Sequence, residues 1–170
     1  VNLLKGEHLT AEHGEKTPYN AVHILELEDG RFLTESAAIL NFLASFFNKR
    51  EDYPTDLVSI ARIHEAELHH DELARRVTVT LVRPLLGVFA GAVKLADAIE
   101  GINTHSEGLV HALQFLDKLL SKQKFIAGNS FTVADYLATC ELNQLPLLSQ
   151  LPGIADTVKI STYPNLVAYL

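Results

Sequence analysis

A Thr-Glu-Ser sequence at positions 34 to 36 contains the residues best suited to chemistry in this chain. An apolar run follows it directly, so we expect Ser36 at the start of a helix, where the helix dipole is positive. The Ser36 hydroxyl and backbone N–H can bind a carboxylate there, while Glu35 can take up an ammonium group. The pair is therefore a candidate for holding an amino acid terminus. A serine helix cap beside a solvated glutamate is the alternative interpretation.

Histidines gather in the segment HEAELHH, from His64 to His70. A zinc protease helix needs its second histidine four residues after the first, and Leu68 occupies that position. The other spacings do not converge on one helix face, so we predict solvated or core histidines and no metal site.

Cys140 is the only cysteine, so an internal disulfide is impossible. We therefore expect a reducing compartment, either the cytoplasm or an organelle such as the mitochondrial matrix. We predict that the Cys140 thiol is buried and unreactive.

The composition limits the class of protein. With 170 residues, of which 48% are hydrophobic, the chain can bury a core. A net charge of -7 argues against a nucleic acid partner, because phosphate binding needs a basic surface. The longest apolar stretch, Pro84 to Val93, is far shorter than the ~20 residues of a membrane span. The chain contains no methionine, so we expect it to begin downstream of the true start.

The first part of the chain alternates strand and helix signals. Val1 to Leu4 is typical of a buried strand, and Thr10 to Lys16 of a weak helical turn. Two strand-like pieces, Ala21 to Leu27 and Arg31 to Leu33, flank an Asp29-Gly30 turn and predict a hairpin. A strongly apolar helix should follow from Glu35 or Ser36.

From Asp56 onward the pattern is helical, after a polar linker from Asn48 to Thr55. The first helix can run to Arg83, before Pro84 ends or kinks it, with one face formed by Leu57, Ile60, Ala61, His64 and Leu68. Thr104 and Glu107 have the spacing of a capping box.

A second pair at this spacing, Thr132 and Asp135, stands before another apolar run. Phe131 and Tyr136 are placed as a hydrophobic staple around it. We predict a core helix with Tyr136, Leu137, Cys140 and Leu145 on its apolar surface, and Thr132 and Asp135 as its structural cap.

Three segments together resemble the cytosolic glutathione S-transferase family, in particular its theta-like members: VNLLKGEHLTAEH from Val1, LEDGRFLTESAAILNFLA from Leu27 to Ala44, and the capped stretch from Phe125. The resemblance covers nearly the whole chain. It implies an α/β thioredoxin-like domain over residues 1–48, with its first strand missing by N-terminal truncation, and an all-helical domain over residues 55–170.

The resemblance also implies site residues. His8 would lie near the glycyl end of glutathione, the Val22 backbone would pair with the cysteinyl part, and Glu35 and Ser36 would hold the γ-glutamyl end. Where the family has a cis proline, this chain has His23. Because a cis bond before another residue costs ~2.5–4 kcal/mol, we predict a trans Val22–His23 peptide. Glu72 and Arg75 would contribute to a substrate cleft, with solvated charges as the alternative.

Two functions of different class follow. The first is a glutathione transferase that uses glutathione as cosubstrate and conjugates its thiol to a small hydrophobic electrophile. It requires a catalytic serine upstream of Val1, since this chain matches none. The second is a noncatalytic subunit of a larger assembly, similar to the domain in the gamma subunit of translation elongation factor one. The expected partner is a second copy or such an assembly.

Overall fold

The computed structural model describes residues 1–2, 5–17 and 19–170, without the side chains of Leu148 and Ser149. Its internal contacts divide the chain into two compact units, Val1–Pro54 and Thr55–Leu170. Each unit has its own secondary structure.

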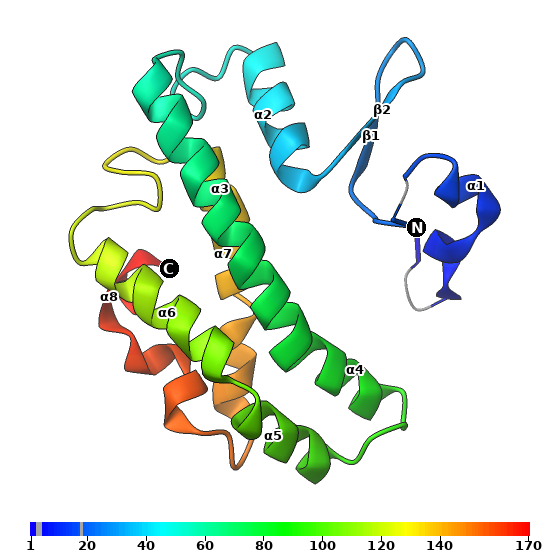
Figure 1. Cartoon of the computed structure of the whole chain (residues 1–170), viewed down its shortest axis with the longest axis vertical. Coiled ribbons are helices and arrows are strands. Elements are labelled where there is room, and N and C mark those ends of the chain that lie inside the picture. Colours follow the sequence, from blue (N-terminus) through cyan, green and yellow to red (C-terminus); the bar gives the residue numbers. More distant parts are fainter. Residues whose placement is uncertain (3–4, 18) are drawn as a thin grey trace. The chain divides into compact units, whose positions relative to one another are not determined.

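The first unit is a small α/β structure (Figure 1). In chain order it contains a 3-10 helix η2 (Glu7–Leu9), helix α1 (Ala11–Gly14), strands β1 (Ile24–Glu26) and β2 (Phe32–Thr34), and helix α2 (Ser36–Phe46). Among the described residues its sheet has two strands. The helical turn, the hairpin and the helix beginning at Ser36 are confirmed.

The hairpin follows from its turn residues. β1 and β2 pair antiparallel with Leu25 opposite Leu33, and Gly30 takes a φ of 80° at the turn. Glycine reaches positive φ without steric cost. The Leu27 N–H donates to the Arg31 carbonyl at 2.8 Å and extends the ladder to the turn.

The predicted strand over Val1 to Leu4 is wrong at its beginning. Val1 and Asn2 lie in no strand, and the Asn2 carbonyl accepts the N–H groups of Lys5 and Glu7, each at 3.2 Å. Leu3 and Leu4 lie outside the described residues, as does Pro18.

The second unit is helical in all its described elements (Figure 1). Helix α3 contacts α6 and α7, α4 contacts α5, and α8 contacts α6. The elements are α3 (Leu57–Val77), the π-helical segment η3 (Thr78–Val82), α4 (Arg83–Phe89), α5 (Leu95–Thr104), α6 (Glu107–Leu120), α7 (Val133–Leu142), the 3-10 segments η4 (Leu145–Gln150), η5 (Asp156–Val158) and η6 (Ile160–Thr162), and α8 (Pro164–Tyr169). No helix in the described part of the chain is long and apolar enough to cross a membrane.

Pro84 does not end the long helix, contrary to one of the two outcomes predicted for it. A proline lacks an N–H and its ring clashes with the carbonyl four residues earlier. The π-helical segment Thr78–Val82 widens the helix just before Pro84, which stands in the first turn of α4. The widened turn accommodates the ring, and the helix continues to Phe89.

The face predicted to be apolar on α3 is not the buried one. Leu57 and Leu68 are 83% and 71% exposed, whereas Ile63, Leu73 and Val77 are buried. The buried residues follow the helical repeat through Ala66, on the opposite side of the helix from Leu68. The apolar character of the α3 residues was not enough to predict which side of the helix packs against α6 and α7.

The cap of α7 is confirmed. Both halves of the capping box between Thr132 and Asp135 are present, with the Thr132 N–H donating to Asp135 Oδ2 at 2.8 Å. The rings of Phe131 and Tyr136 meet edge to face at 4.8 Å, as a hydrophobic staple requires. Asp135 is fully buried, so the helix start lies in the core.

Two predictions around these helices are wrong. Thr104 is the last residue of α5, where its hydroxyl donates to the Glu100 carbonyl at 2.8 Å, and α6 begins after Ser106. Cys140 is exposed rather than buried. It lies four residues after the half-exposed Tyr136, and this spacing places both on the outer face of α7.

Candidate functional site

Glu35 and Ser36 lie together at the head of α2. Ser36 is the first helical residue, and the Glu35 carbonyl accepts the Ile39 N–H at 3.0 Å. Glu35 has φ 72° and ψ 122°, a backbone conformation that residues with a side chain rarely adopt. Such a residue costs on the order of 1–3 kcal/mol and is found mainly where a function needs it.

The backbone N–H groups at this helix start can bind an anion. The first turn of α2 contains no acidic residue, and the Glu35 side chain makes no capping hydrogen bond. The N–H groups of a first helical turn have no intrahelical acceptors and carry the positive end of the dipole. An exposed carboxylate therefore stands next to donors that can bind a second carboxylate.

The segment around Val22 enters β1 through a trans peptide. No cis bond occurs in the described residues, which confirms the trans prediction for Val22–His23. Val22 is half-buried and His23 is exposed. The His13 ring of α1 holds the preceding residue, with Nε2 lying 2.7 Å from the Ala21 carbonyl oxygen.

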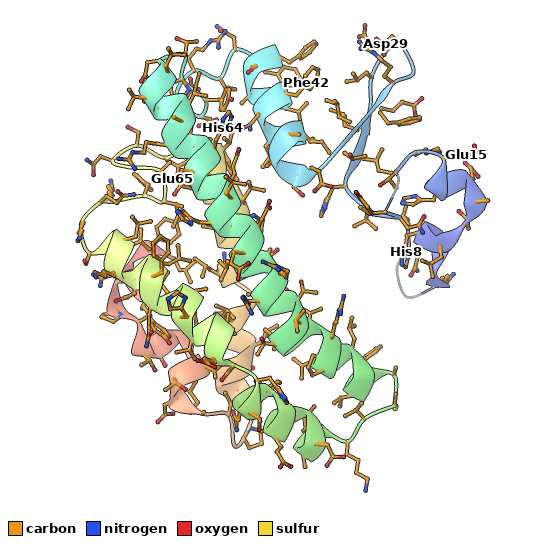
Figure 2. All side chains as sticks on the ribbon, viewed as in Figure 1. His8, Glu15, Asp29, Phe42, His64 and Glu65 are labelled. Atoms are coloured by element: carbon orange, nitrogen blue, oxygen red, sulfur yellow. The ribbon has the colours of Figure 1, made fainter. Side chains whose placement is uncertain are left out.

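His8 lies in the 3-10 helix that directly precedes α1 (Figure 2). Its side chain is half-buried, and Nδ1 has no hydrogen-bond partner among the described residues. Since Nδ1 is covered, a ligand would have to reach the other ring nitrogen. The His13–Ala21 bond brings the Val22 segment next to the helix that follows His8.

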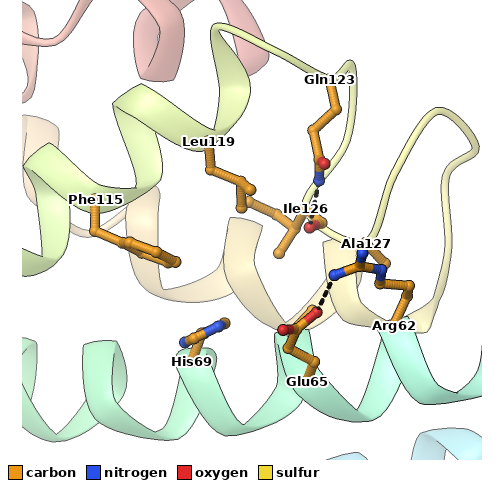
Figure 3. A pocket seen from close by; sticks show the side chains of 9 residues that line it. Arg62, Glu65, His69, Phe115, Leu119, Gln123, Ile126 and Ala127 are labelled. Carbon is orange, nitrogen blue, oxygen red and sulfur yellow. Dashed lines mark hydrogen bonds and ion pairs between the residues drawn. The ribbon is translucent and has the colours of Figure 1, made fainter.

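A groove runs between α3 and α6 in the second unit, and Figure 3 shows the larger of its two hollows. It consists of two adjoining hollows of about 380 and 250 Å³, which share His69 and Phe115. The rings of these two residues are 4.7 Å apart. We call this the α3–α6 groove; its other lining residues include Arg62, Glu65, Glu72, Arg76, Gly108 and His111.

The two predicted cleft residues of α3 differ in their position. Glu72 lines the α3–α6 groove, whereas Arg75 does not. Glu72 forms ion pairs with Arg75 and with Arg76, the latter at 2.6 Å. Two guanidinium groups already neutralise this carboxylate, which favours the interpretation as paired surface charges.

The described residues contain no group of three or more His, Cys, Asp or Glu side chains placed to hold a metal ion. The two neighbouring histidines lie in different environments: His69 lines the groove, whereas the His70 side chain is mostly buried.

Sequence reasoning missed His13 and Tyr169. A single histidine in a weak helical turn gives no signal that its ring will reach a carbonyl eight residues away. Tyr169 bonds Asp135 across 34 residues of sequence. Its position near the buried cap becomes evident only once α8 and α7 are packed.

Comparison with known proteins agrees with this architecture. Residues 102–170 match the family described as glutathione S-transferase, C-terminal domain. The chain is 37% identical over 148 residues to glutathione S-transferase theta-2 of Rattus norvegicus, a match covering 85% of this chain and 59% of the relative. It is 30% identical to glutathione S-transferase PM239X14 of Arabidopsis thaliana, covering 99% of this chain and 75% of that protein.

The solved structure of a delta-class glutathione transferase from Nilaparvata lugens superposes with a TM-score of 0.76 at 25% identity, over 99% of this chain and 71% of that one. The small α/β unit followed by a helical unit is thus the glutathione transferase fold. The chain belongs to the glutathione S-transferase family, as its match to the Arabidopsis thaliana relative shows. Its theta-like character is confirmed by the rat relative. It spans 59% of the length of that relative.

Proposed function

We propose that this protein is a glutathione transferase, which joins the glutathione thiol to small hydrophobic electrophiles. The strained backbone of Glu35 at the head of α2 is the observation that carries the proposal. The γ-glutamyl end of glutathione has both an ammonium group and a carboxylate. Glu35 would bind the ammonium group, while the Ser36 N–H and hydroxyl would bind the carboxylate.

Two further contacts would complete the tripeptide site. The Val22 main chain would pair with the cysteinyl residue, and His8 would donate to the glycyl carboxylate. In the reaction, the deprotonated sulfur attacks an electrophilic carbon, a carbon–sulfur bond forms, and the leaving group departs with its electron pair. By family resemblance a serine after the first strand stabilises the thiolate, and we assign that role to no residue of this chain.

Calorimetric titration with glutathione and with cysteinylglycine tests the γ-glutamyl clamp. The wild type should bind glutathione, and cysteinylglycine at least tenfold more weakly. Glu35→Gln should weaken glutathione binding by at least about tenfold, because it loses a charge-assisted bond of about 1.5–3 kcal/mol. Glu28→Gln is the matched control, since Glu28 is also exposed in the first unit.

Ser36→Pro removes both the N–H donor and the hydroxyl while keeping the helix. Proline is well tolerated at a first helical position. The ψ of 122° at Glu35 is in the range of a residue before proline but its φ of 72° is not, so the melting temperature is measured beside the affinity. Glutathione affinity should fall and the melting temperature should hold. Equal affinity of the wild type for the two peptides would rule out the clamp.

A noncatalytic role in an assembly is the second candidate. It is favoured by His23 and its trans peptide, at the position where the family resemblance places a cis proline. An assay with an aryl halide separates the two functions: conjugation supports the enzyme, whereas glutathione binding without turnover of any tested electrophile supports the noncatalytic role.

We also propose that the chain forms a homodimer through the α3–α6 groove. Phe115 is 40% exposed in it, beside the ion pair of Arg62 with Glu65 at 2.6 Å. Two copies of a mixed apolar and charged surface can pair about a two-fold axis. Light scattering should show a dimer that Phe115→Asp dissociates, and Phe89→Asp, an exposed phenylalanine outside the groove, should leave intact. A monomeric wild type would exclude this interface.

A reducing compartment remains the location we propose, since Cys140 is exposed and has no second cysteine with which to pair.

A further inference from the structure

His13 is a buried histidine in the small unit, 7% exposed, on the four-residue helix α1. Its Nε2 lies 2.7 Å from the Ala21 carbonyl oxygen. A carbonyl oxygen can only accept, so Nε2 must carry the proton and donate it. The hydrogen bond therefore fixes both the tautomer of His13 and the position of the Ala21 carbonyl.

The Ala21 carbonyl and the Val22 N–H belong to the same peptide group. Because a peptide group is planar, holding its carbonyl also sets the direction of its N–H. His13 thus orients the main-chain N–H of Val22 through the neighbouring Ala21 carbonyl.

Few other hydrogen bonds hold this segment in the part of the chain that the structure describes. Asn20 has a positive φ of 52°, and its N–H makes only a long bond of 3.5 Å to the Thr17 carbonyl. His23 follows Val22 and lacks the ring that would restrict a proline backbone. The His13 bond to the Ala21 carbonyl, at 2.7 Å, is much shorter than this Asn20 bond.

We propose that His13 is a positioning residue of the glutathione site. It locks the peptide plane between Ala21 and Val22 so that the Val22 main chain meets the cysteinyl part of the tripeptide. This inference rests on the proposed function. A proline at position 23 would restrict this backbone, but this chain has His23 there. The His13 hydrogen bond supplies the missing constraint on the peptide between Ala21 and Val22.

The test compares His13→Gln with His13→Phe. The glutamine amide nitrogen is as many bonds from Cα as Nε2 is, so it can donate to the same carbonyl. Phenylalanine fills the space without a donor. His105→Phe is the matched control, because the His105 ring also bonds a backbone carbonyl, that of Gly101 at 2.9 Å, but on α5 of the other unit.

Three measurements are made on each protein: the glutathione Kd by calorimetry, the exchange rate of the Val22 amide, and the melting temperature. His13→Phe should weaken glutathione binding about five- to tenfold, the size of one lost neutral hydrogen bond. It should also speed Val22 exchange. His13→Gln should restore most of the glutathione affinity and most of the slow Val22 exchange. His105→Phe should change neither the affinity nor the exchange rate. Where turnover is measurable, KM should rise while kcat holds.

The outcomes separate this role from the proposed function. If the wild type and His13→Phe bind glutathione equally well, His13 does not position the site, but the proposed glutathione site itself is supported. A loss in His13→Phe that His13→Gln does not restore would make His13 a packing residue only. A wild type that does not bind glutathione would overturn both proposals. If His13→Phe does not fold, His13→Asn replaces it, since the shorter amide cannot reach Ala21.

Discussion

Tyr169 on α8 donates its hydroxyl to Asp135 on α7, with 2.8 Å between Oη and Oδ1. The same carboxylate accepts the N–H groups of Ile126 and Thr132, at 2.9 and 2.8 Å, and the Thr132 hydroxyl at 3.2 Å. Burial and the neighbouring Asp135 charge raise the pKa of the Tyr169 hydroxyl above its usual range, which keeps it protonated as a donor. One buried side chain therefore joins the start of α7, the loop before it and α8.

Asp135→Ala should destabilise the helical unit by about 3 kcal/mol, because it leaves several buried donors without an acceptor. Tyr169→Phe should cost about 1 kcal/mol, the net value of one hydrogen bond. Chemical denaturation measures both. Tyr136→Phe is the control, since its side chain is 45% exposed. An unchanged stability of Asp135→Ala would refute the structural role, and a loss of glutathione binding at unchanged stability would make Asp135 a site residue.

Glu35→Gly should separate stability from binding. Glycine adopts a φ of 72° without strain. The free energy of unfolding should therefore stay the same or rise by up to about 1 kcal/mol, and the melting temperature should follow it. The carboxylate is lost, so glutathione binding should weaken at least tenfold. A lower melting temperature would show that the Glu35 side chain stabilises the fold instead.

His70 should make the stability depend on pH. Burial lowers the pKa of His70, against the opposing influence of Glu141 and Asp71. The unfolded chain then takes up a proton near pH 6.5 that the folded one does not. Stability is full above that pH and is lost as the pH falls through the lowered pKa. Denaturation of wild type and His70→Gln from pH 8 to pH 5 should show a smaller loss in the variant, whereas His105→Gln should behave as wild type.

Gly108 and Arg76 should be energetically coupled across the α3–α6 groove. A Cβ on Gly108 would lie 2.6 Å from Arg76 Nη1 and 3.0 Å from Cδ, so the guanidinium would have to leave Glu72. Gly108→Ala gains about 0.5 kcal/mol of helix propensity and loses a surface ion pair of similar value. It should be nearly neutral in the wild type and stabilising in an Arg76→Ala background. A double-mutant cycle measures the coupling, and strict additivity would contradict it.

Local signals in the sequence predicted the elements that local chemistry determines. The Asp29-Gly30 turn, the start of α2 at Ser36 and the capping box of Thr132 with Asp135 each depend on residues a few positions apart. The family resemblance also predicted the glutathione transferase fold.

Features set by packing were not predictable in this way. Thr104 had the spacing of a cap, but a hydrogen bond back to Glu100 kept it inside α5. Cys140 looked like a core residue, yet the buried side of α7 is the side that carries Ala134 and Leu142. His13 and Tyr169 gain their roles from partners 8 and 34 residues away.

The π-helical segment at Thr78–Val82 affects how this chain can be aligned with relatives. A π-bulge is geometrically one extra residue inserted into an α-helix. Each residue rotates the following side chains about the helix axis by about 100°, since a turn has 3.6 residues. Side chains after the bulge are therefore one position out of phase with those before it. A homologue without the bulge should align through this helix only with a single-residue gap between Thr78 and Val82, and an ungapped alignment would pair residues of α4 that face in different directions.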